Sequence, residues 1–285
     1  MKFVKMQGAG NDFVLMETGS MQHDWSRVAV AMCDRHFGVG ADGLLLLLPS
    51  DKADFRMRIF NPDGSEARAC GNGLRCLVKY IKGRRLVSRE ARHVLVETLS
   101  GVRKVKINNG TAANIQASMG MPKLEAENIP VIIGQSTAGM KPVLSHSITV
   151  GGRELLLSFV SMGNPHAVFF SQEPVSNFPL TQLGPKVEQY ELFPVGVNFE
   201  VARVINRQQI EARVWERGVG ETLACGSGAC AITVAARLHD YIDNKVDIRL
   251  PGGILVVEWD GVGEVFLSGP AEVVFTGEWS GQALG

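Results

Sequence analysis

Two stretches of this chain carry nearly the same pattern, in which a cysteine is followed by Gly-x-Gly and then by a helix-like segment. They read ACGNGLRC from Ala69 and ACGSGACA from Ala224, and a glutamate stands four residues before the cysteine in each, at Glu66 and Glu221. Glycines at such positions let the backbone turn sharply and approach a ligand closely. The chain must therefore build the same thiol-bearing turn twice, which favours a duplicated fold.

Further landmarks recur in the same order in both halves. Asn11, in the segment GNDF, precedes Cys70 by 59 residues, and Asn164, in GNPHAV, precedes Cys225 by 61. A Gly-Val-Gly segment lies between the markers in the first half, and Val-Gly-Val lies between them in the second. The offset of roughly 155 positions is much longer than a solenoid repeat, so the pattern indicates two related halves.

The spacing of apolar residues predicts helices at 26–37, with Ser26 as a candidate cap, and at 74–83 and 229–241. Short strands are predicted elsewhere, at 1–6, 14–17, 44–48, 55–60, 93–97, 102–107, 113–119, 147–150, 155–160, 167–170, 197–205, 209–215, 245–250, 254–258, 264–268 and 272–276. Many short strands around few helices favour an α+β fold with mostly antiparallel sheets. We expect one half at 1–119 plus 270–285, because the last strand can return to it, and the other at 120–269.

Composition excludes several classes of protein. Lys plus Arg and Asp plus Glu both number 29, so the net charge is zero and no basic tract points to nucleic acid. The longest aliphatic run, five leucines from Leu44, is too short to cross a bilayer, and the N-terminus does not resemble a signal peptide. We expect a cytoplasmic protein whose odd number of cysteines, five, does not form a disulfide framework.

Two other patterns in the sequence do not fit the binding sites that they formally resemble. The segment from Gly38 to Gly43 formally matches G-x-G-x-x-G, but a helix precedes it and a strand follows it, the reverse of a dinucleotide site. The cysteines within each repeat are six and five residues apart, which does not match a zinc ligand pair. We therefore expect neither a dinucleotide site nor a zinc site.

Cys33, Cys76 and Cys230 lie among apolar residues of helical stretches and are expected to be core residues. Cys70 and Cys225 are different, because each stands where a helix begins. Free N–H groups and the helix dipole stabilise an anion there, which is expected to lower the thiol pKa.

The N–H groups of the same turns, from Gly71 and Asn72 or from Gly226 and Ser227, could bind a carboxylate. If both turns face one ligand, one sulfur can remove a proton from a carbon α to that carboxylate while the other protonates its opposite face.

At these residues the chain resembles the diaminopimelate epimerases, which epimerise an amino acid without a cofactor. The matching segments run from KMQGAGNDF through RIFNPDGSEARACGNGLRC, SMGNPHAV, VGVNFE, WERGVGETLACGSGACA and LPGG to SGPAEVVF. The resemblance implies two similar domains related by a pseudo-two-fold axis, each with a sheet wrapped around a central helix, and an active site in the cleft between them. It also implies conversion of LL- to meso-diaminopimelate, in lysine and peptidoglycan biosynthesis, by a protein that is commonly a homodimer.

The resemblance also assigns roles to residues. It makes Cys70 and Cys225 the acid–base pair, and it makes Glu216 and His166 the pair that tunes the thiols and touches the reacting ammonium. Arg217 is expected to bind the distal carboxylate. The expected substrate contacts also include Asn11, Asn61, Gly71, Asn72, Asn164, Asn198, Glu216, Gly226 and Ser227. One departure is Gly43, which stands where some members have glutamine, so a substrate contact from that side chain is absent.

Three alternatives remain open at this stage. A proline, hydroxyproline or histidine racemase could use the same scaffold, although Asn72 stands where proline-racemase-like proteins usually carry histidine, and Arg217 suits a second carboxylate. An isomerase of the phenazine-biosynthesis type would lack the cysteine pair. A duplicated binding protein would bind its ligand without exchanging the α-hydrogen for solvent.

Overall fold

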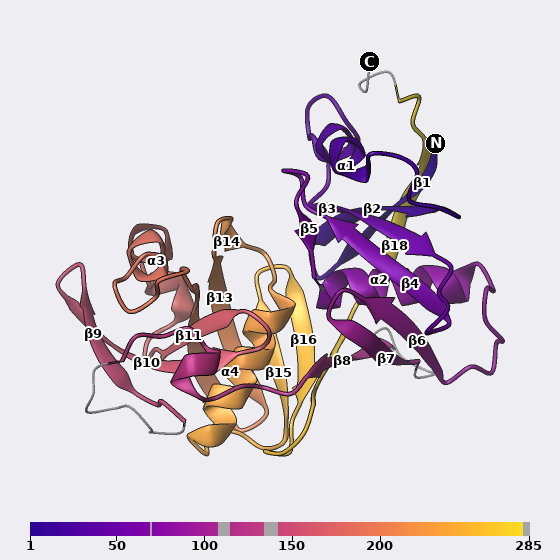
Figure 1. The fold of residues 1–285 in the computed structure, drawn as a ribbon. Helices are drawn as coiled ribbons and strands as arrows, with labels where there is room; N and C mark the ends of the chain where they lie inside the picture. Colours follow the sequence, from indigo (N-terminus) through magenta and orange to yellow (C-terminus); the bar gives the residue numbers. More distant parts are fainter. Residues whose placement is uncertain (69, 108–114, 134–141, 282–285) are drawn as a thin grey trace. The chain divides into compact units, whose positions relative to one another are not determined.

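A computed structural model describes residues 1–68, 70–107, 115–133 and 142–281 of the chain. The chain divides into two units, one formed by Met1–Ser118 with Ser268–Gly285 and the other by Met119–Leu267 (Figure 1). The chain passes from one unit to the other twice, and each unit has its own core. Among the residues described, no helix combines the length and the apolar character needed to cross a membrane.

In its described residues the first unit has two helices, α1 (Trp25–Cys33) and α2 (Gly71–Gly83). Its strands are β1 (Lys2–Gly8), β2 (Asn11–Glu17), β3 (Gly43–Leu48), β4 (Phe55–Phe60), β5 (Glu66–Ala67), β6 (His93–Thr98), β7 (Gly101–Ile107), β8 (Ile115–Gly120) and β18 (Glu272–Glu278). The predicted strand at 113–119 begins outside the described residues and is seen from Ile115. The last strand does return to the first half, because β18 pairs with β1 in antiparallel fashion (Figure 1).

The leucine run of β3 explains how the first unit is layered. Side chains alternate along a strand, so Leu45 and Leu47 enter the cluster around α2, whereas Leu44, Leu46 and Leu48 pack with α1. All five leucines are buried because both faces of this strand are covered by helices.

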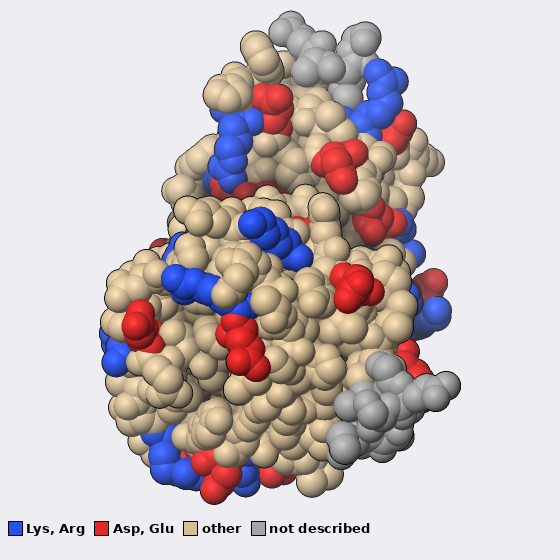
Figure 2. All heavy atoms as spheres, turned by 90° about the vertical axis from the view of Figure 1, so that its left-hand side faces the viewer, with Lys and Arg blue, Asp and Glu red and all other residues tan. Residues whose placement is uncertain are grey.

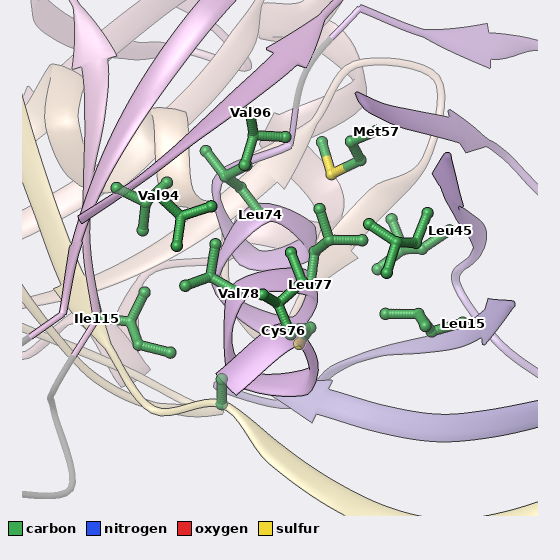
Figure 3. Close-up of a cluster of buried hydrophobic side chains, with 14 of the residues drawn as sticks. Leu15, Leu45, Met57, Leu74, Cys76, Leu77, Val78, Val94, Val96 and Ile115 are labelled. Carbon is green, nitrogen blue, oxygen red and sulfur yellow. The ribbon is translucent and has the colours of Figure 1, made fainter. Parts of the chain in front are cut away.

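Helix α2 lies in the centre of the first unit's larger core. Its apolar residues Leu74, Leu77, Val78 and Ile81 recur at helical spacing and are all buried. Figure 3 shows side chains from β2, β3, β4, β6 and β8, including Val94, pointing toward this helix. Helix α2 is therefore fixed by core packing, and this packing also fixes the position of its N-terminal residues.

The second unit contains the helices α3 (Leu180–Glu188) and α4 (Gly226–Leu238) and the 3₁₀ turns η1 (Ala126–Asn128) and η2 (Val175–Asn177). Its strands are β9 (His146–Val150), β10 (Arg153–Ser161), β11 (Pro165–Phe170), β12 (Asn198–Asn206), β13 (Gln209–Glu216), β14 (Gly220–Thr222), β15 (Lys245–Leu250), β16 (Gly253–Glu258) and β17 (Val265–Gly269). Helix α4 packs on β10, β11, β12 and β16, and its buried segment from Ala229 to Ala236 includes four alanines, which allow a close approach to the sheet.

The two units repeat one order of strand pairing. In the first unit β2–β3 is parallel, β3–β4 antiparallel, β4–β6 parallel and β6–β7 antiparallel. In the second unit β11–β12, β12–β13, β13–β15 and β15–β16 follow the same alternation. The predicted α+β class with two similar halves is confirmed, and the sheets are mixed, with these parallel pairs among more numerous antiparallel ones.

Some local predictions are wrong for identifiable reasons. Asp24, not Ser26, caps α1, because its side chain accepts a hydrogen bond from the Arg27 amide. Helix α3 was not predicted, since its sequence contains Gly184 and Pro185, which usually interrupt helices. The packing of α3 requires glycine at position 184, because a Cβ there would lie 2.5 Å from the Trp215 ring.

Candidate active site

Cys70 is the residue that begins helix α2. Its backbone is extended, with φ −146° and ψ 119°, and its sulfur accepts a hydrogen bond of 3.4 Å from the Gly73 amide. A Cβ at Gly73 would lie 3.0 Å from a methyl carbon of Leu45, so glycine fits this turn best. We call residues Cys70 to Gly73 the first thiol turn.

Asn11 contacts two residues of the first thiol turn, Asn72 and Cys70. The Asn11 carbonyl oxygen Oδ1 accepts from the Asn72 amide at 3.3 Å and from the Cys70 thiol at 3.9 Å. The Asn11 amide nitrogen donates to Asp42 at 2.7 Å, which turns Oδ1 toward the thiol. Three of the expected site residues therefore come together here, whereas the Asn61 side chain donates to Ser65 in its own turn.

We call the first thiol turn together with Asn11 the first half-site. Two residues that support it were not identified from the sequence. Arg75 is fully buried, and its guanidinium donates to the Asn72 carbonyl oxygen at 2.7 Å, which leaves the Asn72 amide free to reach Asn11. Asp42 holds the other side of Asn11. Gly43, next to Asp42, sits where a Cβ would approach the Phe60 carbonyl oxygen to 3.1 Å, so a side chain there would have to push the β3–β4 pair apart.

Asp12 anchors the same region through a charge network. Its carboxylate accepts from Lys5 and from Arg35, and Arg35 also binds Asp42. Burial raises the pKa of Asp12, but the hydrogen bonds from Arg35 and Lys5 outweigh it and lower that pKa to about 2. The network supports the strand that carries Asn11.

This lowered pKa predicts acid sensitivity. A carboxyl group with a folded pKa near 2 and an ordinary value of 3.8 contributes stability above pH 3.8, and this contribution is lost as the pH falls toward 2. Partial exposure reduces it to about 1–2 kcal/mol. We expect Asp12→Asn to lose that part of the fall in urea-unfolding free energy between pH 4 and pH 2. An unchanged pH dependence in the variant would contradict the assignment.

Cys225 caps helix α4 in the same way. Its φ is −120° and its ψ 116°, and its sulfur accepts from the Gly228 amide at 3.4 Å. We call residues Cys225 to Gly228 the second thiol turn. The Ser227 hydroxyl oxygen lies 3.5 Å from the sulfur and accepts from the Asn164 amide, also at 3.5 Å.

The expected lowering of the thiol pKa is wrong for Cys225. Burial raises its pKa well above the ordinary value, and the nearby carboxylate of Glu216 raises it further. The Ser227 hydroxyl and the Gly228 amide act in the opposite direction but do not compensate. Burial therefore favours the protonated form of the Cys225 thiol.

His166 and Glu200 form a buried pair next to the second thiol turn. We call this turn together with Asn164, His166 and Glu200 the second half-site. His166 Nδ1 lies 2.6 Å from Glu200 Oε1, and Nε2 lies 3.0 Å from the Asn164 carbonyl oxygen. Both side chains are completely buried. His166, which was expected to tune the thiols, contacts Glu200 and Asn164 through its two ring nitrogens. Glu200 was missed, although its position two residues after Asn198 places both on one face of β12.

Asn198, Glu216 and Arg217 lie at the adjacent ends of β12 and β13. The Asn198 side chain donates to the Pro165 carbonyl oxygen at 2.8 Å and accepts from the Arg217 amide at 3.0 Å. Glu216 accepts from Thr222 at 2.6 Å and lies close enough to Cys225 to act on its charge. The Arg217 side chain is exposed and makes one hydrogen bond, to the Val195 carbonyl oxygen, among those seen in the described residues.

Gly228 is the tightest point of the second thiol turn. A Cβ there would lie 2.9 Å from Glu200 Oε1 and 3.4 Å from the Cys225 sulfur. We expect Gly228→Ala to reduce activity about tenfold or more and to cost about 1–3 kcal/mol in stability, since the buried Glu200 carboxyl group is held by His166 and cannot move aside freely. Gly83→Ala, where nothing lies within 4 Å of a Cβ, is the control and should cost neither. Equal effects of the two substitutions would contradict this packing.

No group of three or more His, Cys, Asp or Glu side chains in the described ranges is arranged to hold a metal ion. The polar groups of the two half-sites are instead thiols, amides, carboxylates and guanidinium groups. Such groups suit an amino acid with its carboxylate and ammonium.

Comparisons with known proteins agree with one another. The family model described as diaminopimelate epimerase matches residues 3–125 and 158–274. A protein named diaminopimelate epimerase from Moorella thermoacetica is 46% identical over 98% of this chain and 99% of its own length. Another of that name from Acetivibrio thermocellus is 44% identical over 98% of both chains.

A solved structure shows the same fold at lower similarity. It is a hydroxyproline epimerase from Agrobacterium vitis with bound trans-4-hydroxy-L-proline, which is 14% identical to this chain and has a TM-score of 0.69. The match covers 97% of this chain and 91% of the other. At this identity the likeness concerns the fold alone.

Proposed function

This chain belongs to the diaminopimelate epimerase family, and from that premise we propose that it interconverts LL- and meso-2,6-diaminopimelate with two thiols and no cofactor. The observation that carries the proposal is the pair of helix-capping cysteines, Cys70 and Cys225, at equivalent places in the two units. The proposal requires both thiol turns to meet one substrate molecule.

In the proposed reaction the thiolate of one cysteine takes the proton from the α-carbon and becomes a thiol. The thiol of the other cysteine gives its proton to the opposite face of that carbon and becomes a thiolate. One C–H bond breaks and another forms, so the protein ends with the two roles exchanged. Burial favours the protonated form of Cys225, and we therefore propose that this thiol donates the proton in the first half of the cycle.

The first N–H groups of a helix have no acceptor inside that helix, and the dipole makes this end attractive to anions. We propose that the reacting carboxylate binds there, at Gly71 and Asn72 and at Gly226 and Ser227. The negative charge that develops when the α-proton leaves spreads into this carboxylate, where the same donors stabilise it.

The remaining contacts are proposed to select the substrate. Arg217 is exposed and suits the distal carboxylate, and Asn198 holds its backbone in place. The Glu216 carboxylate is proposed to bind the reacting ammonium group, and its negative charge raises the pKa of Cys225. Asn11, Asn61 and Asn164 are proposed to complete the polar lining of the site.

The proposed partner is a small molecule and not a nucleic acid. Figure 2 shows one face on which basic and acidic side chains are interspersed, without a broad area of one sign. The chain also has equal numbers of basic and acidic residues, 29 of each. A polyanion would require a basic surface.

We also propose that the protein works as a homodimer in the cytoplasm. The odd number of cysteines, five, argues against a disulfide framework and suits a reducing compartment. Strand β18 exposes Val273, Val274 and Phe275, an apolar surface that a second copy could cover. Light scattering on the purified protein tests the dimer, and a monomer at micromolar concentration would refute it.

The function itself is tested by incubating the protein with LL-diaminopimelate in deuterated water. The proposal predicts meso product that carries one deuterium at the inverted α-carbon, because the second thiol exchanges its proton with solvent. Proline and histidine, each with a single carboxylate, should not be racemised at a comparable rate. Binding of diaminopimelate without deuterium incorporation would overturn the proposal.

A further inference from the structure

The Asn164 amide group contacts two side chains of the second half-site. Its nitrogen lies 3.5 Å from the Ser227 hydroxyl oxygen, and its carbonyl oxygen lies 3.0 Å from His166 Nε2. A carbonyl oxygen can only accept a hydrogen bond. His166 Nε2 must therefore carry a hydrogen.

This requirement determines how many protons the buried pair holds. At the 2.6 Å contact, either His166 Nδ1 donates to a Glu200 carboxylate or a Glu200 carboxylic acid donates to bare Nδ1. In both cases the pair holds a single proton at that contact and has no net charge. Neutrality is what complete burial of both side chains requires, and burial raises the pKa of Glu200 in the same sense.

We propose that Glu200 is a positioning residue of this half-site, which keeps a hydrogen on His166 Nε2 and thereby holds the Asn164 NH₂ group toward Ser227 and the thiol turn. Turned the other way, Asn164 would present a carbonyl oxygen, which repels a carboxylate. The consequence for catalysis rests on the proposed function, in which a carboxylate binds at this turn.

The first half-site provides a comparison. There Asn11 gives its amide nitrogen to Asp42 and presents its oxygen to Cys70, the reverse of the arrangement at Asn164. The two asparagines occupy equivalent places before the two cysteines, yet their amides point in opposite ways. The orientation is therefore set by the supporting side chain, Asp42 in one half and the Glu200–His166 pair in the other.

The packing around Glu200 supports the same role. Glu200 Oε1 occupies the space that a side chain at position 228, in the second thiol turn, would need. The other carboxyl oxygen, Oε2, is buried without a hydrogen-bonding partner among the described residues. His166 therefore provides the contact that orients this carboxyl group.

The direct test is the protonation of His166 in the unmodified protein, without substrate. Nitrogen-15 NMR of histidine-labelled protein, with the His166 signals assigned by comparison with His166→Gln, distinguishes the two ring nitrogens. The proposal predicts a hydrogen-bearing Nε2 at neutral pH. A bare Nε2 with the hydrogen on Nδ1 would overturn it. Because no turnover is measured, this result does not depend on whether the proposed function is correct.

Two variants test the consequence for catalysis. In Glu200→Gln the amide NH₂ can donate to Nδ1 and impose the same Nε2–H form, so kcat/KM should stay within about threefold of wild type. Glu200→Met makes no hydrogen bond, and loss of such a supporting partner should lower kcat/KM by about 10- to 100-fold, mainly through KM. Glu211→Met, on neighbouring β13, is the control and should have little effect.

Similar losses in the Gln and Met variants would overturn the proposal, since the site would then need the charge and not the tautomer. No loss in either would overturn it as well. If Glu200→Met fails to fold, the Gln variant still decides, because it must retain both its activity and the hydrogen on Nε2. Failure of the wild-type protein to epimerise diaminopimelate would instead refute the proposed function.

Discussion

Cys70→Ala and Cys225→Ala are each expected to lower epimerisation by about 10³-fold or more, because either change removes the proton carrier on one face of the α-carbon. The fold should survive, since the hydrogen bond that each cysteine sulfur contributes to its helix cap is weak, with a length of 3.4 Å. Initial rates on LL-diaminopimelate, together with circular dichroism, test both statements. Cys230→Ala, in the same helix as Cys225, is the control and should retain activity.

The two cysteine variants should also differ from each other in a diagnostic way. Each retains one thiol, which can remove and return a proton on its own face, so each variant should exchange the α-hydrogen of only one of the two isomers with solvent. The preferred isomer should be opposite in the two variants. Exchange of the same isomer by both, or near-wild-type activity in either, would contradict the two-thiol mechanism.

Arg217→Leu is expected to produce the second large effect. Loss of a guanidinium that binds a carboxylate costs about 2–4 kcal/mol, so kcat/KM for diaminopimelate should fall by roughly 30- to 1000-fold, mainly through KM. Steady-state kinetics of the variant, with Arg249→Leu on an exposed position of β15 as control, provide the measurement. An unchanged KM would show that the distal carboxylate binds elsewhere.

Much of the fold follows from local patterns in the sequence. The strands at 55–60 and 245–250 have the predicted bounds, because alternating apolar residues leave little choice of register. Helices α2 and α4 begin three residues earlier than predicted, at Gly71 and Gly226, since glycines that usually weaken helices are needed there for close packing.

The supporting residues of the candidate site were harder to predict. Arg75 and Glu200 are charged residues that the sequence offers as ordinary surface positions, and only tertiary packing buries them beside Asn72 and His166. The pKa of Cys225 was also misjudged, because the helix position was visible in the sequence whereas the depth of burial was not. The thiol turns can be recognised from motifs, but the side chains that surround them are distant along the chain.

The most direct test of the central claim is a crystal structure of the Cys70→Ser, Cys225→Ser double variant with bound diaminopimelate. The account predicts that the two serine oxygens lie on opposite faces of a single α-carbon, each about 3–4 Å from it. A complex in which either serine lies in a pocket without substrate would contradict it.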